Sequence, residues 1–221
     1  MPEITQRPSP NFGDRRDGLR PTLILIHYTA MDSAQAAIDW LCNPKAEVSA
    51  HYVICEFGHI TQLVAEEKRA WHAGVGQWKG YDDVNSRSLG IELSNRGDHP
   101  FAEAQMSALE RLLPEMMTRW GLSPKCVIGH SDMSPGRKID PGPRFDWRRL
   151  AQQGLAVWPD EAPATGDWAE AASSFGYDVT HPNCLEAFRA RFRPWATGPI
   201  DAEDARIAVR LAQSSYSLLP S

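Results

Sequence analysis

The sequence lacks the features of a membrane-spanning or exported chain. No apolar stretch among its 221 residues approaches the ~20 consecutive residues needed to cross a bilayer. Residues 1–20 are polar and rich in proline, without the apolar segment of a signal peptide. We therefore expect a cytoplasmic protein, or a periplasmic or envelope protein if a leader has been removed from this sequence.

Cysteine is scarce, and positive charge is not in excess. Cys42, Cys55, Cys126 and Cys184 form no C-x-x-C pair, which argues against a zinc–thiolate cluster and a disulfide framework. We expect buried, reduced thiols. The net charge of -5 argues against a broad basic face for nucleic acid. The composition, 42% hydrophobic and 23% charged, is that of an ordinary folded protein of one or two domains.

Short apolar runs alternate with stretches of helical spacing, which predicts an α/β fold: a central mixed β-sheet flanked by helices. Pro114 lies inside the longest helical stretch and should kink or divide that helix. Residues 69–83 are rich in glycine and tryptophan and predict a long loop. The expected strands are residues 22–28, 49–56, 59–64, 88–93 and 126–129, with the second and third forming a hairpin, and the expected helices are residues 34–41, 102–120 and 145–153.

The composition also divides the chain. We predict an extended arm at residues 1–20, the α/β domain at 21–159, and a linker rich in proline, alanine and glycine at 160–166. Residues 167–221 predict a small domain of three short helices. Its core would be thin, so it should lean on the larger domain.

Two histidines and a carboxylate stand out in the α/β domain. His27 ends the apolar run of residues 23–26, His130 ends another short run, and Asp140 follows it across a loop containing Pro135 and Gly136. Two histidines and one carboxylate make one ligand set of a catalytic zinc, with a fourth position open for water. Taken singly, each histidine is more often a packed, hydrogen-bonded residue, so spacing alone leaves both interpretations open.

Glu92 and Lys138 also have two interpretations. Glu92 lies near the end of an apolar run, where burial would raise its pKa and suit it to proton transfer. The alternative is a solvated strand end. Lys138 lies two residues before Asp140, on the same side of an extended segment, where an ammonium could stabilise an oxyanion. Its alternative is an ordinary surface lysine.

Five segments then occur in an order that resembles a known family. They are "ILIHYTA", "SAHYVI", "AWHAG", "SLGIELSNRG" and "GHSDMSPGRKIDPGP", within residues 21–159. They resemble the zinc-dependent N-acetylmuramoyl-L-alanine amidases. That family includes bacterial amidases of cell-wall recycling and remodelling and some phage lysozymes, and it is related to the peptidoglycan recognition proteins.

The resemblance implies a function and a set of roles. The enzyme would hydrolyse the amide between N-acetylmuramic acid, or its 1,6-anhydro form, and L-alanine of the stem peptide. One Zn2+ would be held by His27, His130 and Asp140. Glu92 would act as general base and return the proton to the leaving amine, and Lys138 would stabilise the oxyanion. The expected partners are peptidoglycan or its fragments.

Further positions match the family near the substrate cleft. We expect His51, Trp71, His72, Asn95 and Arg96 to contact substrate, or in the case of the histidines and the tryptophan to support the residues that do. The alternatives are a purely structural role for His51, Trp71 and His72 and a solvated surface arginine at position 96. One departure concerns Ala50, where some phage members carry a tyrosine that assists catalysis. If a hydroxyl is needed, another residue must supply it.

The C-terminal aromatic residues, including Phe175, Tyr177, Phe188 and Phe192, resemble in spacing the small three-helix peptidoglycan-binding modules. The alternative is a helical cap that completes the fold. For the whole chain, the alternative function is a non-catalytic peptidoglycan-binding protein, and metal analysis separates it from the amidase. A third possibility is a zinc amidase or deacetylase that acts on a substrate unrelated to the cell wall.

Overall fold

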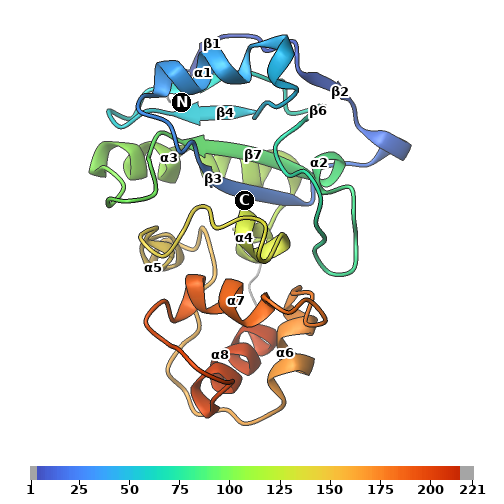
Figure 1. The fold of residues 1–221 in the computed structure, drawn as a ribbon, viewed down its shortest axis with the longest axis vertical. Helices are drawn as coiled ribbons and strands as arrows, with labels where there is room; N and C mark the ends of the chain where they lie inside the picture. The colour runs from blue at the N-terminus through green and yellow to red at the C-terminus, as the bar shows by residue number, and fades with distance from the viewer. Residues whose placement is uncertain (1–3, 215–221) are drawn as a thin grey trace.

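The computed structural model describes residues 4–214, and a mixed six-stranded sheet forms its centre (Figure 1). The strands are β1 (Ile4–Gln6), β2 (Phe12–Asp14), β3 (Leu23–Tyr28), β4 (Tyr52–Ile54), β5 (Ile60–Gln62), β6 (Lys68–Ala70), β7 (Ser88–Leu93) and β8 (Val127–Gly129). The helices are α1 (Ala34–Leu41), α2 (Val84–Arg87), α3 (Glu103–Trp120), α4 (His130–Met133), α5 (Trp147–Gln152), α6 (Trp168–Phe175), α7 (Cys184–Phe192) and α8 (Ala202–Gln213).

The sheet has the order β1-β5-β4-β7-β3-β8, and its neighbouring strands are parallel except for the pair β4 and β5. That antiparallel pair is the predicted hairpin, and Gly58 forms its turn with a left-handed φ of 82°. The predicted mixed sheet with flanking helices is therefore confirmed.

The two faces of the sheet bury different residues, because successive side chains of a strand point to opposite sides. On β3, Ile24 and Ile26 join the core under α3, whereas Leu23 and Leu25 join a second cluster on the opposite face. His27 continues the second set. The face opposite α3 therefore carries the first candidate ligand.

The long helix α3 differs from its predicted form. It runs through Pro114 without interruption, so the expectation that proline might divide it is wrong. Buried apolar residues on both sides of the proline, Leu113 and Met116 among them, pack on the sheet and hold the helix together. The helix ends at Gly121, whose left-handed φ of 64° stops it.

The N-terminal arm is more than the predicted extended segment. Strand β1 pairs with β5 at the edge of the main sheet, and β2 pairs with β6 in a separate two-stranded sheet. Arg15 fastens the arm, since its guanidinium donates to four backbone carbonyls of residues 66–88. Strands β1 and β2 have three residues each, too few for an alternating pattern to be recognised in the sequence. Residues 1–3 of the predicted arm lie outside the described residues.

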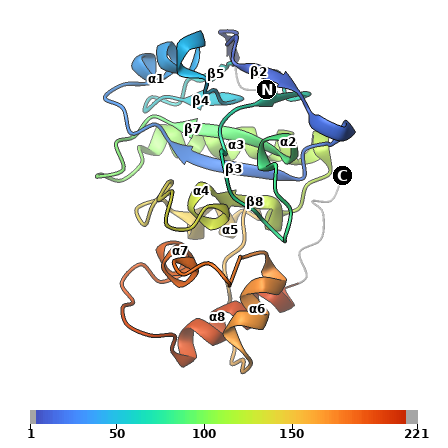
Figure 2. The same ribbon diagram turned by 45° about the vertical axis from the view of Figure 1, so that its right-hand side comes forward.

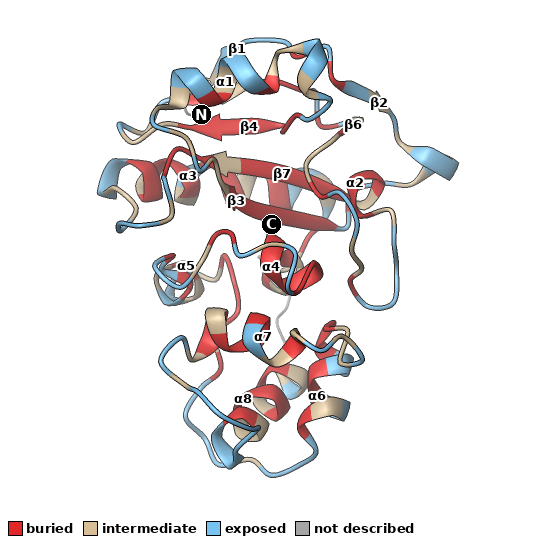
Figure 3. Ribbon diagram, in the orientation of Figure 1, coloured by how far each residue is buried: buried red, intermediate tan, exposed pale blue. Residues whose placement is uncertain are grey.

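Three helices follow the sheet layer, as predicted (Figures 1 and 2). Phe175, Phe188 and Phe192 belong to one apolar cluster with Leu25 of β3 and Ile128 of β8. This cluster continues from the sheet into the helices, so the small unit leans on the larger one. Figure 3 shows that the inner sides of α6, α7 and α8 are buried and their outer sides are exposed. Residues 215–221 of the predicted domain lie outside the described residues.

The three helices begin with different caps. Asp167 and Asp201 accept backbone hydrogen bonds at the starts of α6 and α8. Asn183 precedes α7 without a capping hydrogen bond, and its side-chain amide donates to Glu186.

A buried polar cluster joins the helices to the segment that carries His130. Arg191 donates to the Asp132 carboxylate (Nη1 to Oδ2, 2.7 Å) and lies 3.9 Å above the ring of Trp147. The hydroxyl of Tyr177 donates to the other oxygen of Asp132. Because α4 spans only residues 130–133, this cluster anchors the turn that begins with His130.

Arg191→Met is expected to destabilise the protein by about 3–5 kcal/mol, because it leaves the buried Asp132 carboxylate without its cation. Urea unfolding of the variant and the wild type measures the difference. Arg148→Met, at an exposed arginine, is the matched control and should change stability by less than about 0.5 kcal/mol. Equal stability of the two variants would contradict the anchoring role.

Two further expectations concern membrane-spanning segments and the cysteines. No helix within residues 4–214 is long and apolar enough to cross a membrane. All four cysteines are free thiols, but only Cys184 is buried, and Cys42, Cys55 and Cys126 are half-buried. The expectation of buried thiols is therefore wrong for three of them, since they lie at the ends of elements, where Cys42 and Cys126 pack only at the margins of the core clusters.

Candidate active site at the ends of three parallel strands

Strand register brings three of the candidate residues to one level of the sheet. His27 on β3 is the register partner of Glu92 on β7. On the other side of β3, Ile26 pairs with Gly129, and His130 follows directly at the start of α4. The carboxyl ends of three adjacent parallel strands therefore present His27, Glu92 and His130 side by side, as ligand-binding groups often are in α/β sheets.

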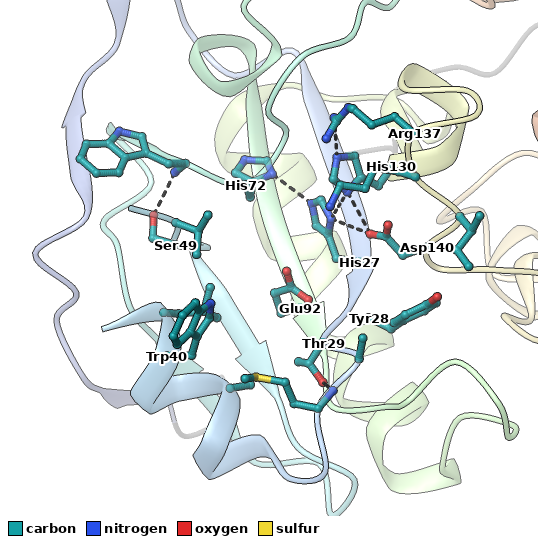
Figure 4. Close-up of a pocket in the computed structure, with 18 residues that line it drawn as sticks. His27, Tyr28, Thr29, Trp40, Ser49, His72, Glu92, His130, Arg137 and Asp140 are labelled. Atoms are coloured by element: carbon teal, nitrogen blue, oxygen red, sulfur yellow. Dashed lines mark hydrogen bonds and ion pairs between the residues drawn. The ribbon is translucent and has the colours of Figure 1, made fainter. Parts of the chain in front are cut away.

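Asp140 returns to the same point by the loop that follows α4. The Ser131 amide donates to the Asp140 carbonyl at 2.9 Å, which closes the loop. Oδ2 of Asp140 then lies 2.9 Å from Nδ1 of His27 and 3.0 Å from Nδ1 of His130 (Figure 4). The two Nδ1 atoms are 3.0 Å apart, and all three residues are buried.

This triangle suits a metal ion. Ligands at about 2.0–2.1 Å from a tetrahedral ion lie about 3.3 Å from one another, so these atoms need move apart by only a few tenths of an ångström. Two ring nitrogens and a carboxylate oxygen in mutual contact also form a set of lone-pair donors that a cation between them would satisfy. Within residues 4–214, this is the group of three such side chains that can hold a metal.

The ionisation of the group fits the same use. Burial and the neighbouring His130 lower the pKa of His27 to about 4, although Asp140 opposes the shift, so the His27 ring is neutral at pH 7. Burial opposes ionisation of Asp140, but its close contacts with His130 and His27 outweigh it and hold the pKa of Asp140 below its usual range. A neutral imidazole and an ionised carboxylate are the forms that bind metals.

Glu92 points into the pocket beside His27 (Figure 4). Its Oε2 is buried and has no hydrogen-bond partner among residues 4–214. Burial and the neighbouring Asp140 carboxylate together raise the pKa of Glu92 to about 8, against the opposing charge of Lys138. An unpaired carboxyl with a raised pKa is typical of groups that transfer protons.

The metal group and Glu92 lie in a pocket of about 400 Å3, which lies between α1 and the loop carrying Asp140. Lys138, Trp71 and His72, all predicted for the site, line it. Sequence reasoning missed the lining residues from α1 and from the end of β3. These are Tyr28, Thr29, Ala30, Met31, Ala37, Trp40 and Leu41, together with Val48, Ser49 and Ile139. Trp40 and Ile139 are exposed apolar side chains that line the same pocket, and this signal exists only once the fold is known.

Three predicted substrate contacts lie elsewhere. His51 is fully buried; its Nδ1 accepts from the Gly90 amide, and its Nε2 contacts the Lys68 carbonyl. The Asn95 side chain holds a turn: it accepts from the Gly97 amide and donates to the carbonyls of His99 and Pro100. Arg96 is exposed and paired with Asp32. None of the three lines the pocket.

If catalysis needs a hydroxyl in place of the tyrosine that some phage members carry at position 50, Tyr28 and not Tyr52 is placed to supply it. Tyr52 donates its hydroxyl to Glu66 and is buried under the sheet, on the other side from His51, as the strand alternation predicts. Tyr28 is the tyrosine that lines the pocket among residues 4–214.

Glu92→Gln should change how the stability of the metal-free protein depends on pH. Unfolded Glu92 ionises near its ordinary pKa of 4.5, whereas the folded group holds its proton to about pH 8. The folded state therefore binds more protons between these values, and its stability falls as pH rises from about 4.5 to about 8. The glutamine variant lacks this loss, so its stability relative to wild type should increase across that window. Parallel pH profiles in urea unfolding would contradict the assignment.

Comparisons with known proteins agree with the site. A family model described as N-acetylmuramoyl-L-alanine amidase matches residues 17–143. The N-acetylmuramoyl-L-alanine amidase AmiD of Escherichia coli is 36% identical over 88% of this chain and 83% of AmiD. The 1,6-anhydro-N-acetylmuramyl-L-alanine amidase AmpD of the same species is 35% identical over 65% of this chain and 87% of AmpD.

Solved structures agree as well. The complex of E. coli AmiD with the substrate anhydro-N-acetylmuramic acid-L-Ala-D-gamma-Glu-L-Lys superposes with a TM-score of 0.78 at 35% identity, over 94% of both chains. AmpDh3 of Pseudomonas aeruginosa in complex with anhydromuramic pentapeptide gives a TM-score of 0.75 at 32% identity, over 92% of this chain and 94% of AmpDh3. By its matched segment, its relatives and its fold, this chain belongs to the N-acetylmuramoyl-L-alanine amidase family.

Proposed function

We propose that this protein is a zinc-dependent amidase that cleaves the bond between N-acetylmuramic acid, or its 1,6-anhydro form, and L-alanine of the stem peptide. The observation that carries the proposal is the convergence of His27, His130 and Asp140 beside the unpaired carboxyl of Glu92 in one pocket. A metal triad and a proton-transfer group side by side are what amide hydrolysis requires.

His27, His130 and Asp140 would hold the zinc ion through Nδ1, Nδ1 and Oδ2. Bound there, zinc supplies Lewis acidity toward a carbonyl oxygen and toward water. Asp140 contributes the negative charge of the set, and the imidazole rings of His27 and His130 complete it.

Glu92 takes the proton of the attacking water and returns it to the nitrogen of the leaving L-alanine. Without a metal, the raised pKa of Glu92 keeps its carboxyl mostly protonated near neutral pH. A cation bound beside His27 would lower that pKa and favour the carboxylate, which is the form that accepts a proton. A base with a pKa near the working pH both accepts and releases a proton readily.

Lys138 stabilises the charge that develops on the lactyl carbonyl oxygen. It lines the pocket two residues before Asp140 and, in the described part of the chain, makes no ion pair. Its ammonium is thus available to a negative charge in the pocket. Trp71 and Trp40 offer apolar walls for the sugar and the peptide.

The substrate class follows from the relatives. The substrate in the AmiD complex is an anhydro-N-acetylmuramic acid with a three-residue peptide, and the AmpDh3 complex contains an anhydromuramic pentapeptide. We extend this class to the present protein, since both structures cover more than nine-tenths of the chain. The proposed partners are therefore peptidoglycan fragments or peptidoglycan itself.

Two substrates test the proposal and its biological setting. Mass spectrometry should detect free tripeptide after incubation with 1,6-anhydro-muramyl tripeptide, and a chelator should abolish the release. Cleavage of the small fragment alone fits a recycling enzyme of the cytoplasm, whereas cleavage of intact sacculi as well fits an enzyme of the envelope. No release from either substrate would refute the proposal and favour a binding protein.

Peptidoglycan binding by residues 167–221 stays a prediction. The aromatic residues that suggested it, Phe175, Tyr177, Phe188 and Phe192, are buried, so their spacing reflects packing. Trp195, after α7, is an exposed aromatic residue of this unit. Trp195→Ala should therefore weaken sedimentation with sacculi if the unit binds them, and unchanged sedimentation would leave the three helices as structural support.

A further inference from the structure

We propose that the dipeptide His72-Ala73, held by Asn85 and Ser88, fixes the tautomers of both metal-binding histidines. The dipeptide would thereby leave Nδ1 of His27 and Nδ1 of His130 without a hydrogen, each with a lone pair ready for a metal ion. This inference rests on the proposed metal site, and it assigns positioning roles to residues that do not touch the ion.

The first contact fixes His130. Its outer nitrogen, Nε2, lies 2.8 Å from the carbonyl oxygen of Ala73. A carbonyl only accepts hydrogen bonds, so Nε2 must carry the hydrogen. Nη2 of Arg137 also lies 3.3 Å from Nε2, but it donates to the Ala73 carbonyl at the much shorter distance of 2.6 Å. A neutral ring has a single N–H, and Nδ1 of His130 is therefore left with its lone pair toward Asp140 and the metal position. Arg137 donates to the same carbonyl and reinforces it as an acceptor.

The second contact fixes His27 through a relay. The Ser88 hydroxyl lies 2.6 Å from the Val84 carbonyl and must donate to it. The hydroxyl has then used its hydrogen, so toward His72 it can only accept, and Nε2 of His72, 3.3 Å away, carries the hydrogen. Nδ1 of His72 is left as an acceptor, 3.0 Å from Nε2 of His27.

His27 must therefore donate from Nε2, and its Nδ1 also faces the metal position with a lone pair. The chain of donors runs from His27 to His72, then to Ser88, and ends at a backbone carbonyl of residue 84. Each ring nitrogen of His27, His72 and His130 has one possible role, because the relay from His27 ends at the carbonyl of Val84 and the contact of His130 ends at the carbonyl of Ala73. Figure 4 shows the bond from His72 to the outer side of His27 and the metal-facing side of His27 turned to Asp140.

Two further features hold the dipeptide in place. Oδ1 of Asn85 accepts from the backbone amides of both His72 and Ala73, at 2.9 and 2.8 Å. Gly90 leaves room for the His72 ring, since a Cβ there would lie 2.5 Å from Cγ and Nδ1 of that ring. Asn85 is buried, and it links the relay to α2, far in sequence from either metal-binding histidine.

A fixed tautomer should strengthen metal binding. Outer partners of metal-bound histidines commonly contribute about 10–100-fold in metal affinity, because they orient the ring and select the nitrogen that binds. The dipeptide supplies such a partner to both histidines at once. Its loss should therefore weaken zinc binding without removing a ligand.

The first test is spectroscopic and needs no substrate. Long-range proton–nitrogen correlation spectra of the isotope-labelled full chain, metal-free and zinc-loaded, should show His72 protonated at Nε2 only. They should also show His27 and His130 protonated at Nε2. A hydrogen on Nδ1 of His72 would overturn the relay.

The second test measures zinc affinity by chelator competition. His72→Phe keeps a ring but removes the acceptor, and it should weaken zinc binding by about 10–100-fold. His72→Asn restores an acceptor oxygen near the Nδ1 position and should recover part of the loss. Ser94→Ala, at the buried serine that follows β7, is the control, because no hydrogen bond of its hydroxyl occurs within residues 4–214, and its affinity should be unchanged.

Equal affinity of His72→Phe and the control would overturn the proposal, provided that circular dichroism shows both variants folded. Should His72→Phe fail to fold, Ser88→Ala tests the same relay one bond further away, with the His72 tautomer as its readout. These outcomes are separate from those of the proposed function, since a protein that cleaves no amide can still bind zinc and show the expected tautomers.

Discussion

Glu92→Gln should lower the rate of amide cleavage by about 100- to 10,000-fold and leave the zinc content unchanged. General base catalysis contributes a factor of this size, and glutamine fills the same space but cannot accept the proton. Glu92 is not a member of the metal triad, so the ion should remain. The assay is tripeptide release from the anhydro-muramyl substrate, with zinc measured on the same samples by atomic emission.

Glu67→Gln provides the control for this substitution, since it makes the same change at an exposed glutamate. It should keep wild-type activity. A fully active Glu92→Gln variant would rule out the proton-transfer role, and loss of zinc from that variant would mean that Glu92 supports the ion instead.

Asp140→Asn should abolish both zinc retention and activity. Oδ2 of Asp140 touches both ligand nitrogens, and asparagine keeps the shape but removes the only negative charge of the triad. The loss of zinc affinity should exceed the about 10–100-fold cost of losing an outer partner, because a direct ligand is lost. Equilibrium dialysis against buffered zinc measures the change.

Thermal unfolding gives an independent readout of the same variant. A ligand that binds only the folded state raises the midpoint of unfolding, so zinc should stabilise wild type and not Asp140→Asn. Asp98→Asn, at an exposed aspartate, should respond to zinc as wild type does. Equal stabilisation of both variants by zinc would place the metal elsewhere in the protein.

Much of the site could be predicted because its residues follow apolar runs. Leu23–Ile26 and Leu89–Ile91 are buried strands, and side-chain alternation then puts His27 and Glu92 on the same face. The register that aligns His27 with Glu92, and His130 beside them, could not be predicted, since no local pattern encodes which strands become neighbours.

The missed features share one cause, which is that they depend on contacts between distant segments. Strand β1 is three residues long and exists because β5 offers it an edge. Trp40 reaches the pocket only because α1 packs on β4, and Pro114 stays inside a helix because the sheet beneath holds it. The same holds for His51, whose ring binds backbone groups of β7 and of residue 68.

The most direct test of the amidase assignment is the identity of the bond that breaks. Cleavage of the anhydro-muramyl tripeptide in heavy-oxygen water should place the heavy oxygen in the lactyl carboxylate of the muramic acid product. The tripeptide should carry a free L-alanine amine and no label. Label in the peptide, or an intact muramyl–alanine bond after prolonged incubation with zinc, would contradict the account.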